Sequence, residues 1–334
     1  MKGAILCFFF CLVWLLPGCA RFGCSLPEPG NTYLRSIAFE EGRSSRDYHI
    51  HIPLRYDPKK RIPLLIILHG SFSSGSEIER LTGFSSLADR ENLLVAYPES
   101  HGMFTFLKHW NAGFCCGKAT LDGWDDVGFI KAVIQDVSRH FPVDLNRIYL
   151  AGFSNGGMLA FRFAAEQSHL VAAVATVSAA IGAQSDFEQT PWTLSDPRTP
   201  VPVLAFHGLS DDSVPYFGGR STRHRIYSFA SVRDSIQFWI LHNDCLMTPA
   251  SYKSICNGMI LHQQWKGRTE ENEVVLYTIA DWGHEWPGRG RRPPFTCQGE
   301  TFDAAEIMWN FFKRHHGKES VEDPAITAGI KSPH

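Results

Sequence analysis

Ser154 lies in the stretch 152–156, GFSNG, which has the G-x-S-x-G spacing of a nucleophilic serine. A serine hydroxyl is a weak nucleophile, so it must be exposed on a tight turn where a base can reach it. The apolar run 148–151 predicts a short strand before the serine, and the small residues after it predict the start of a helix. A Cβ at either glycine is expected to collide with the neighbouring strand or helix. The stretch therefore predicts a reactive serine on a strand-to-helix turn.

Two polar loops farther along the chain carry the groups that could activate this serine. Asp211 and Asp212 follow the apolar run 203–206, and His284 follows the run 274–279. We expect His284 to accept the serine proton and later return it to the leaving group, while a carboxylate holds the imidazole in the correct tautomer. Because Asp211 and Asp212 are adjacent, the residues alone leave the identity of the acid open.

An oxyanion formed at the serine needs two hydrogen-bond donors beside it. The main-chain N–H of Asn155, directly after the serine and at a predicted helix N-terminus, is one candidate. The N–H of Ser71, in the loop after the apolar run 62–68, is the other. Two more histidines, His69 and His207, lie in these polar loops. We expect both to be structural hydrogen-bonding residues and not the base.

The elements that must position these residues alternate along the chain. Strands are predicted at 33–39, 47–52, 62–68, 93–97, 148–151, 171–177, 203–206 and 274–279, and helices at 77–90, 125–140, from the serine to about 166, 229–242 and 302–315. This alternation predicts an α/β fold with a doubly wound, mostly parallel sheet and helices on both faces. The candidate residues follow the carboxyl ends of strands, where ligands bind in such sheets. Asp125 and Asp126 are interpreted as N-caps of the second helix.

Composition favours one exported domain. The chain has 334 residues, of which 44% are hydrophobic and 20% charged, and its net charge of -2 argues against nucleic acid as a partner. The apolar run 4–16 is too short to span a membrane and predicts a signal peptide over 1–19. Cys19 ends a stretch similar to a lipoprotein cleavage site, so free secretion and a lipid anchor at Cys19 both stay open. We expect a linker at 20–32, a catalytic domain at 33–316 and a polar tail at 317–334.

Cysteine usage agrees with export to an oxidising compartment. The chain has nine cysteines. Outside the leader they are Cys24, Cys115, Cys116, Cys245, Cys256 and Cys297. Six cysteines allow about fifteen pairings. We expect Cys245 to pair with Cys256, because a short polar loop separates them, and the adjacent Cys115 and Cys116 to reach different partners. No zinc-binding spacing is present, so no metal and no cofactor are predicted.

The segment 98–123 has no clear period and is predicted to be a long functional loop. Trp110 lies in it, and Trp286 comes two residues after His284. Both are large amphipathic side chains that we expect to line the substrate cleft above Ser154. The alternative is that each covers an edge of the core.

Six motifs together resemble the secreted polyhydroxybutyrate depolymerase and feruloyl esterase family. They are LHG at 68–70, WNAGFCCG at 110–117, DDVGFI at 125–130, GFSNGGM at 152–158, HGLSDDSVPY with FGG at 207–219, and GHEWPG at 283–288. The resemblance spans 33–312 and implies the α/β-hydrolase fold, with the chain order serine, acid, histidine. It also implies Asp211 as the acid and a disulfide between Cys245 and Cys256. The sequence departs from the family's pattern at Ser71, Phe72 and Phe114, and we expect these departures to affect substrate preference.

The resemblance implies an exported serine carboxylic ester hydrolase with an acyl-enzyme mechanism. Its substrates would be hydroxyalkanoate esters or feruloyl and acetyl esters of plant cell-wall polysaccharides. Two alternatives are a serine peptidase on the same fold and a lipid-anchored binding protein with an inactive site. An intact serine, aspartate and histidine argue against the latter, because a binding protein gains nothing from a strained serine turn.

Overall fold

The computed structural model describes residues 28–39, 44–102, 104, 108–186, 191–269, 272–289, 296–297 and 300–317. The predicted signal peptide with Cys19, most of the predicted linker including Cys24, and the tail beyond Gly317 lie outside these residues. Within the described part of the chain, no helix is long and apolar enough to cross a membrane.

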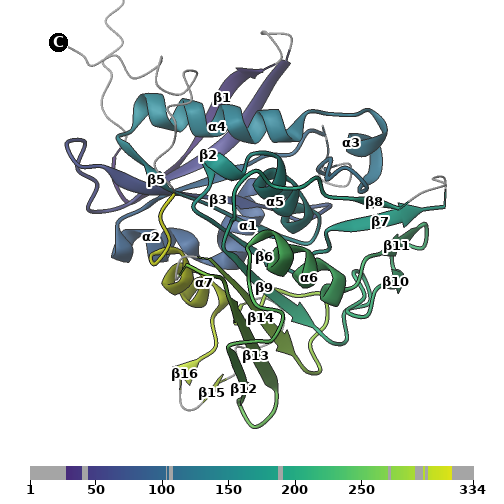
Figure 1. Ribbon diagram of the computed structural model, residues 1–334. Coiled ribbons are helices and arrows are strands. Elements are labelled where there is room, and N and C mark those ends of the chain that lie inside the picture. Colours follow the sequence, from purple (N-terminus) through teal and green to yellow (C-terminus); the bar gives the residue numbers. More distant parts are fainter. Residues whose placement is uncertain are drawn as a thin grey trace, which may run out of the picture.

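A ten-stranded sheet forms the centre of the protein (Figure 1), in the order β1-β2-β4-β3-β5-β6-β9-β14-β13-β12. Its strands are β1 (Asn31–Phe39), β2 (Ser44–Ile52), β3 (Ile62–Leu68), β4 (Leu94–Pro98), β5 (Val143–Phe153), β6 (Ala173–Val177), β9 (Val203–Gly208), β12 (Ser251–Ile255), β13 (Ile260–Lys266) and β14 (Glu273–Ile279). The six strands from β4 to β14 in this order are parallel. Antiparallel strands extend the sheet at both ends.

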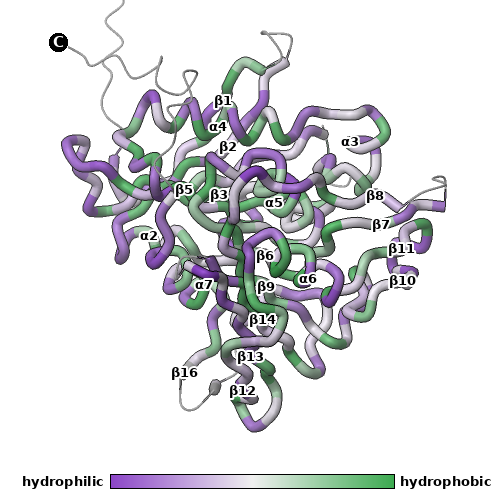
Figure 2. The backbone as a smooth tube through the Cα atoms, viewed as in Figure 1, coloured by the Kyte–Doolittle hydropathy of each residue, from purple (hydrophilic) through white to green (hydrophobic). Residues whose placement is uncertain are grey.

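Helices cover both faces of this sheet. Residues of α1 (Gly75–Thr82), α2 (Phe84–Glu91) and α7 (Ala304–Phe312) belong to one buried cluster, and residues of α4 (Asp126–His140), α5 (Asn155–Glu166) and α6 (Val232–His242) belong to the other. Strand β3 supplies both clusters, because successive side chains point to opposite faces: Leu64 and Ile66 to one, Leu65 and Ile67 to the other. In Figure 2 hydrophobic residues gather along the central strands. The predicted α/β-hydrolase fold is confirmed.

A small second sheet lies beside the first (Figure 1), in the order β10-β11-β7-β8. Its strands are β7 (Gly182–Ser185), β8 (Trp192–Thr193), β10 (Gly219–Arg220) and β11 (Tyr227–Phe229). These segments follow the carboxyl ends of β6 and β9 along the chain. The remaining short elements are α3 (Gly117–Leu121), the 3-10 turn η2 (Ser168–Leu170), β15 (Thr296–Cys297) and β16 (Glu300–Thr301).

The structure differs from the predictions for one helix, one loop and one helix-capping residue. The predicted helix 77–90 is two helices, because Gly83 adopts a left-handed φ of 68° between them and caps the first. Strand β12 lies within the predicted polar loop between Cys245 and Cys256, and its hairpin partner β13 was not predicted. Asp125 is the N-cap of α4 as predicted, its carboxylate accepting from Gly128 N at 2.8 Å. Asp126 is not a cap: it is fully buried in an ion pair with Arg46 at 2.7 Å.

The predicted pairing of Cys245 with Cys256 is wrong. Cys245 carries a free thiol, whereas Cys256 is disulfide-bonded. The two cysteines flank opposite ends of β12, whose five residues (Ser251–Ile255) span about 16 Å at about 3.3 Å each. A disulfide tolerates at most about 7 Å between Cα atoms. The second half of the polar stretch between them, Ser251–Ile255, is an extended strand.

The expectation that the adjacent Cys115 and Cys116 bond to different partners is also wrong. Cys115 and Cys116 are joined to each other, with 3.0 Å between their Cα atoms. The peptide bond between them is cis.

Candidate active site

Ser154 occupies a sharp turn between β5 and α5. Its φ of 55° lies in the left-handed region that non-glycine residues rarely adopt. Two glycines make the turn possible: a Cβ on Gly152 would lie 2.3 Å from the carbonyl oxygen of Gly156, and one on Gly156 would lie 2.3 Å from that of His69. The turn is fixed to the sheet by a hydrogen bond from Ser154 N to the carbonyl of Val177 at 2.9 Å. The serine therefore stands at the carboxyl edge of the sheet in a strained, fixed geometry.

The structure brings Ser154, His284 and Asp211 into one hydrogen-bonded chain. His284 Nε2 lies 2.8 Å from Ser154 Oγ, and His284 Nδ1 lies 2.8 Å from Asp211 Oδ2. With a proton on Nδ1, the imidazole can accept the serine proton at Nε2. The ring of Phe153 lies behind the imidazole, with 5.0 Å between ring centroids. All three sequence candidates thus meet at one point.

The geometry separates the two adjacent aspartates. Asp211 is buried, and its second oxygen, Oδ1, accepts from the main-chain N–H groups of Ser213 at 2.9 Å and Val214 at 2.8 Å. Burial by itself raises the pKa of the Asp211 carboxyl, but the hydrogen bond and charge of His284 outweigh it, so the pKa lies below its usual value. Asp212 is exposed, and its carboxylate accepts only from Ser213 Oγ among the described residues. Asp211 is the carboxylate that orients the imidazole.

The sheet explains why two loops distant in sequence meet. Strands β9 and β14 are parallel neighbours, so the loops after them leave the same edge. The loops are also bonded to each other, because Leu209 N donates to the carbonyl of Ile279 at 2.9 Å and Ser210 N to that of Trp282 at 3.0 Å. A Cβ on Gly208 would lie 2.0 Å from the Trp282 oxygen, so only glycine allows this approach. Asp211 and His284 are therefore positioned by one packed unit.

The other two histidines have structural partners. His69 is fully buried; its Nδ1 donates to the carbonyl of Gly70 at 2.7 Å, and its Nε2 accepts from Ser100 N at 3.1 Å. Burial lowers the pKa of His69 to about 4, so the ring stays neutral at neutral pH. His207 donates from Nε2 to the carbonyl of Val214 at 2.8 Å, and burial lowers its pKa as well. Neither ring reaches Ser154 by a hydrogen bond.

The predicted oxyanion donors lie on the two segments that flank Ser154. Gly70 packs against the serine so closely that a Cβ on it would lie 3.3 Å from Ser154 Cβ, which places the next residue, Ser71, beside the site. Asn155 N is the first N–H of α5 and has no acceptor within the helix. Within the described part of the chain, neither the Ser71 nor the Asn155 main-chain N–H has a hydrogen-bond partner. Both are free to bind a negatively charged oxygen.

The sequence predicted that Trp110 lines the substrate cleft, but the structure contradicts this. Trp110 instead joins the two segments that carry the candidate oxyanion donors. Its side chain is fully buried. Its indole Nε1 donates to the carbonyl of His69 at 2.8 Å, and its main-chain N donates to Asn155 Oδ1 at 2.6 Å. The amide of Asn155 returns a bond to the Trp110 carbonyl at 3.0 Å. Trp110 therefore fixes the distance between the two candidate oxyanion donors.

The prediction for Trp286 is wrong for the same reason, because only 1% of its side chain is exposed. It packs edge-on against Phe84 and Phe153, with 6.5 Å and 6.4 Å between ring centroids. Phe153 in turn contacts the imidazole of His284. Trp286 supports the position of the histidine from inside the core and has no surface for a substrate.

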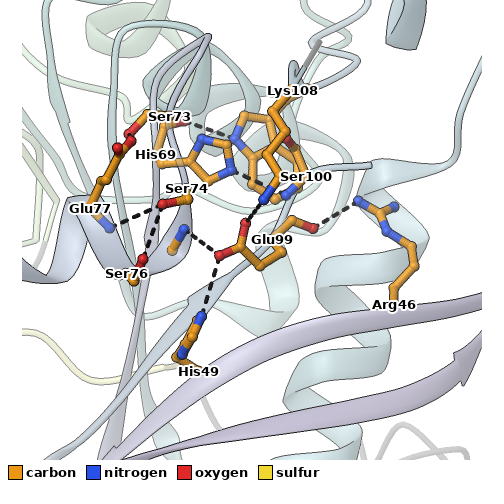
Figure 3. A network of polar contacts seen from close by, with 12 residues as sticks. Arg46, His49, His69, Ser73, Ser74, Ser76, Glu77, Glu99, Ser100 and Lys108 are labelled. Carbon is orange, nitrogen blue, oxygen red and sulfur yellow. Dashed lines mark hydrogen bonds and ion pairs between the residues drawn. The ribbon is translucent and has the colours of Figure 1, made fainter. Parts of the chain in front are cut away.

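A network centred on Glu99 holds the loop after β3 (Figure 3). The Glu99 carboxylate accepts from Lys108 Nζ at 2.6 Å, from Gly75 N at 2.8 Å and lies 3.3 Å from His49 Nε2. Burial alone would raise the pKa of Glu99, but the hydrogen bonds from His49 and Lys108 outweigh it and hold the pKa at about 2. The carboxylate ties β2, the start of α1 and the long loop together around the site. Sequence reasoning missed this network, because its members are far apart in the chain.

The arrangement can perform acyl transfer. Ser154 Oγ can attack an ester carbonyl while His284 takes its proton, and the two free N–H groups can bind the oxygen that becomes negative. Among the described residues, no group of three histidine, cysteine or acidic side chains is placed to hold a metal ion.

Comparisons with known proteins agree with this fold and chemistry. The family model described as Phospholipase/Carboxylesterase matches residues 127–244. Feruloyl esterase B of Piromyces equi is 27% identical over 237 residues, which cover 70% of this chain and 42% of that protein. The bifunctional acetylxylan esterase/xylanase of Neocallimastix patriciarum is 28% identical over 177 residues, or 53% of this chain and 23% of that protein. The chain spans less than half the length of these first curated relatives.

A solved structure shows the same fold. The acetyl xylan esterase from Aspergillus awamori superposes with a TM-score of 0.57, covering 84% of this chain and 99% of that one at 13% identity. At this identity the likeness concerns the fold alone. Residues 127–244, which the family model matches, contain Ser154 and Asp211, whereas His284 lies beyond them.

Proposed function

We propose that this protein, an α/β hydrolase related to carboxylesterases and to feruloyl and acetylxylan esterases, is a serine carboxylic ester hydrolase. The observation that carries the proposal is the chain of two 2.8 Å hydrogen bonds from Ser154 through His284 to Asp211. The substrates are feruloyl or acetyl esters of plant cell-wall polysaccharides or hydroxyalkanoate esters.

The reaction proceeds in two halves. In the first, Ser154 Oγ attacks the ester carbonyl carbon, His284 takes the hydroxyl proton, and the N–H groups of Ser71 and Asn155 bind the developing oxyanion. The imidazolium then protonates the departing alcohol, which leaves an acyl group on the serine. In the second half, His284 takes a proton from a water molecule, whose oxygen attacks the acyl carbonyl carbon. The bond from that carbon to Ser154 Oγ then breaks, the imidazolium returns its proton to Ser154 Oγ, and the carboxylic acid leaves. Asp211 stabilises the imidazolium in both halves.

Two considerations support the substrate class. The feruloyl and acetylxylan esterases among the relatives act on esters of the kind that their names give. The six sequence motifs that resemble the polyhydroxybutyrate depolymerase and feruloyl esterase family include the loops that hold Ser154, Asp211 and His284. Hydroxyalkanoate esters enter the proposal through this resemblance alone.

A panel of esters tests the function. The wild-type protein and the Ser154→Ala variant are assayed with methyl ferulate, acetylated xylan and a hydroxybutyrate oligomer. We expect the wild type to hydrolyse at least one of them and the variant to lose that activity by several orders of magnitude. A wild type inactive on all three, or a variant with unchanged turnover, would contradict the proposal.

We also propose that the protein is exported, on the basis of the leader at 1–19 and the six cysteines that follow it. Mass spectrometry of protein recovered from the native host distinguishes a lipid-anchored protein from a freely secreted one. A diacylglyceryl group on Cys19 indicates a lipid anchor, and an unmodified N-terminus beyond it indicates free secretion. An intact leader on the mature protein would contradict export.

A further inference from the structure

Three aromatic or imidazole rings from separate loops meet next to the segment that carries Ser71. Phe72 follows the proposed oxyanion donor Ser71, His109 comes from the long loop after β4, and His224 comes from the segment between β10 and β11. The Phe72 ring packs edge-on against His109, with 4.6 Å between centroids, and is nearly parallel to His224, with 6.5 Å between centroids and 19° between planes. We call these three residues the ring cluster.

Phe72 is held in a conformation that keeps its ring exposed. Its φ of 61° is left-handed, which is costly for a bulky residue, and its N–H donates to the carbonyl of Lys108 at 2.9 Å. Despite its apolar side chain, Phe72 is 51% exposed. The strained backbone thus directs a large apolar ring out of the core. Packing of the core gains nothing from this orientation.

His224 is fixed to the loop of the acid. Thr222 N and Oγ1 both donate to the carbonyl of Asp212, at 3.2 Å and 3.0 Å, and His224 N donates to Ser221 Oγ at 2.8 Å. Burial lowers the pKa of His224, and the charge of His284 lowers it further.

The ring cluster thus joins the two loops that carry the reacting groups. On one side Phe72 is bonded in sequence to Ser71, and on the other His224 is tied to the residue after Asp211. The three rings form a group of planar surfaces next to these loops, a property that favours a flat aromatic group over a small or flexible aliphatic one.

We propose that the ring cluster binds the aromatic part of an aromatic acyl ester, with Phe72 as its main contact. The inference rests on the proposed function and deepens it, because it selects aryl-acyl esters over acetyl and hydroxyalkanoate esters. It assigns to Phe72, His109 and His224 the role that the sequence had predicted for Trp110 and Trp286, whose side chains are buried. Phe72 contributes to selectivity through contact with the acyl group and takes no part in proton transfer.

The experiment compares two esters of one alcohol, methyl ferulate and methyl butyrate. For each variant we measure kcat/KM on both and take their ratio as the selectivity. Phe72→Ala should lower the ratio about tenfold, as expected for loss of one aromatic contact, and Phe72→Tyr should restore it. The control is Tyr252→Ala, which removes an aromatic residue that is 65% exposed on β12. Its ratio should stay within about twofold of the wild type.

A binding measurement separates the failure of this inference from that of the proposed function. The Ser154→Ala protein and the double variant with Phe72→Ala are titrated with methyl ferulate by calorimetry, after thermal melting shows that both are folded. The double variant should bind about tenfold more weakly. Equal affinities, no binding to either protein, or equal losses of kcat/KM on both esters would overturn the inference. A wild type that hydrolyses neither ester but binds methyl ferulate through Phe72 would overturn only the proposed function.

Discussion

Replacing Asp211 by asparagine tests how the site orients its base. In the wild type, Oδ1 of Asp211 accepts from the main-chain N–H groups of Ser213 and Val214, while Oδ2 faces His284 Nδ1. An asparagine has only one carbonyl oxygen, and the two main-chain donors require that oxygen at the Oδ1 position. The amide NH2 of the variant must then point at His284.

The consequence for catalysis follows from the tautomer. An NH2 group facing Nδ1 needs a lone pair there, so the imidazole proton moves to Nε2, which faces Ser154 Oγ at 2.8 Å. A protonated Nε2 cannot accept the serine proton. For a triad aspartate changed to asparagine, the expected loss in kcat is about 10⁴-fold. The same change at the exposed Asp212 leaves the imidazole untouched, so its effect should be less than about threefold.

The assay is kcat for hydrolysis of a short-chain aryl ester at neutral pH, on wild type, Asp211→Asn and the matched control Asp212→Asn. Asparagine preserves the two main-chain hydrogen bonds, so thermal melting should show a folded variant. A loss of less than tenfold in Asp211→Asn, or a larger loss in Asp212→Asn, would refute the reasoning.

Two further predictions concern the supports of the site. Because the pKa of Glu99 is lowered from 4.5 to about 2, its stabilising effect is complete above pH 4.5 and is lost as the pH falls towards 2. The free energy of unfolding, measured with denaturant, should therefore fall between pH 6 and pH 3 by about 2 kcal/mol less in Glu99→Gln than in the wild type, because about 1.5 pH units of the pKa difference lie above pH 3. Equal losses would exclude this role. Trp110→Phe removes the indole donor to the His69 carbonyl and should lower kcat about tenfold with little change in KM. The same change at the half-buried Trp124, between α3 and α4, should leave kcat unchanged. An unchanged kcat in Trp110→Phe would show that this bond does not position the oxyanion donors.

Much of the parallel core could be predicted because continuous apolar runs in the sequence indicate strands that are buried on both faces. Residues 62–68 are almost entirely apolar, as a strand buried on both faces must be, and β3 has these bounds. The strand, turn and helix around Ser154 were predicted from the spacing of glycines that the packing requires. The small sheet was not predicted, since strands of two to four residues are too short to show a period.

The other features could not be predicted, because they depend on three-dimensional contacts that a single sequence does not specify. Asp211 and Asp212 are chemically identical, and only the hydrogen bonds of the folded loop separate them. The burial of Trp110 and Trp286 depends on which side of each loop faces the core. Phe72 had no distinguishing signal beyond its place after Ser71, because its exposure follows from a left-handed backbone. The hairpin of β12 and β13 was missed because its exposed residues are mostly polar.

The central claim is that Ser154 is the nucleophile of an acyl-transfer reaction. Its most direct test is covalent labelling with a serine-directed phosphonate, followed by peptide mass spectrometry of the wild type and the Ser154→Ala variant. We expect one adduct on the wild type, located on Ser154, with loss of esterase activity in proportion to labelling, and no adduct on the variant. Labelling at another residue, or full activity in a protein labelled at Ser154, would contradict it.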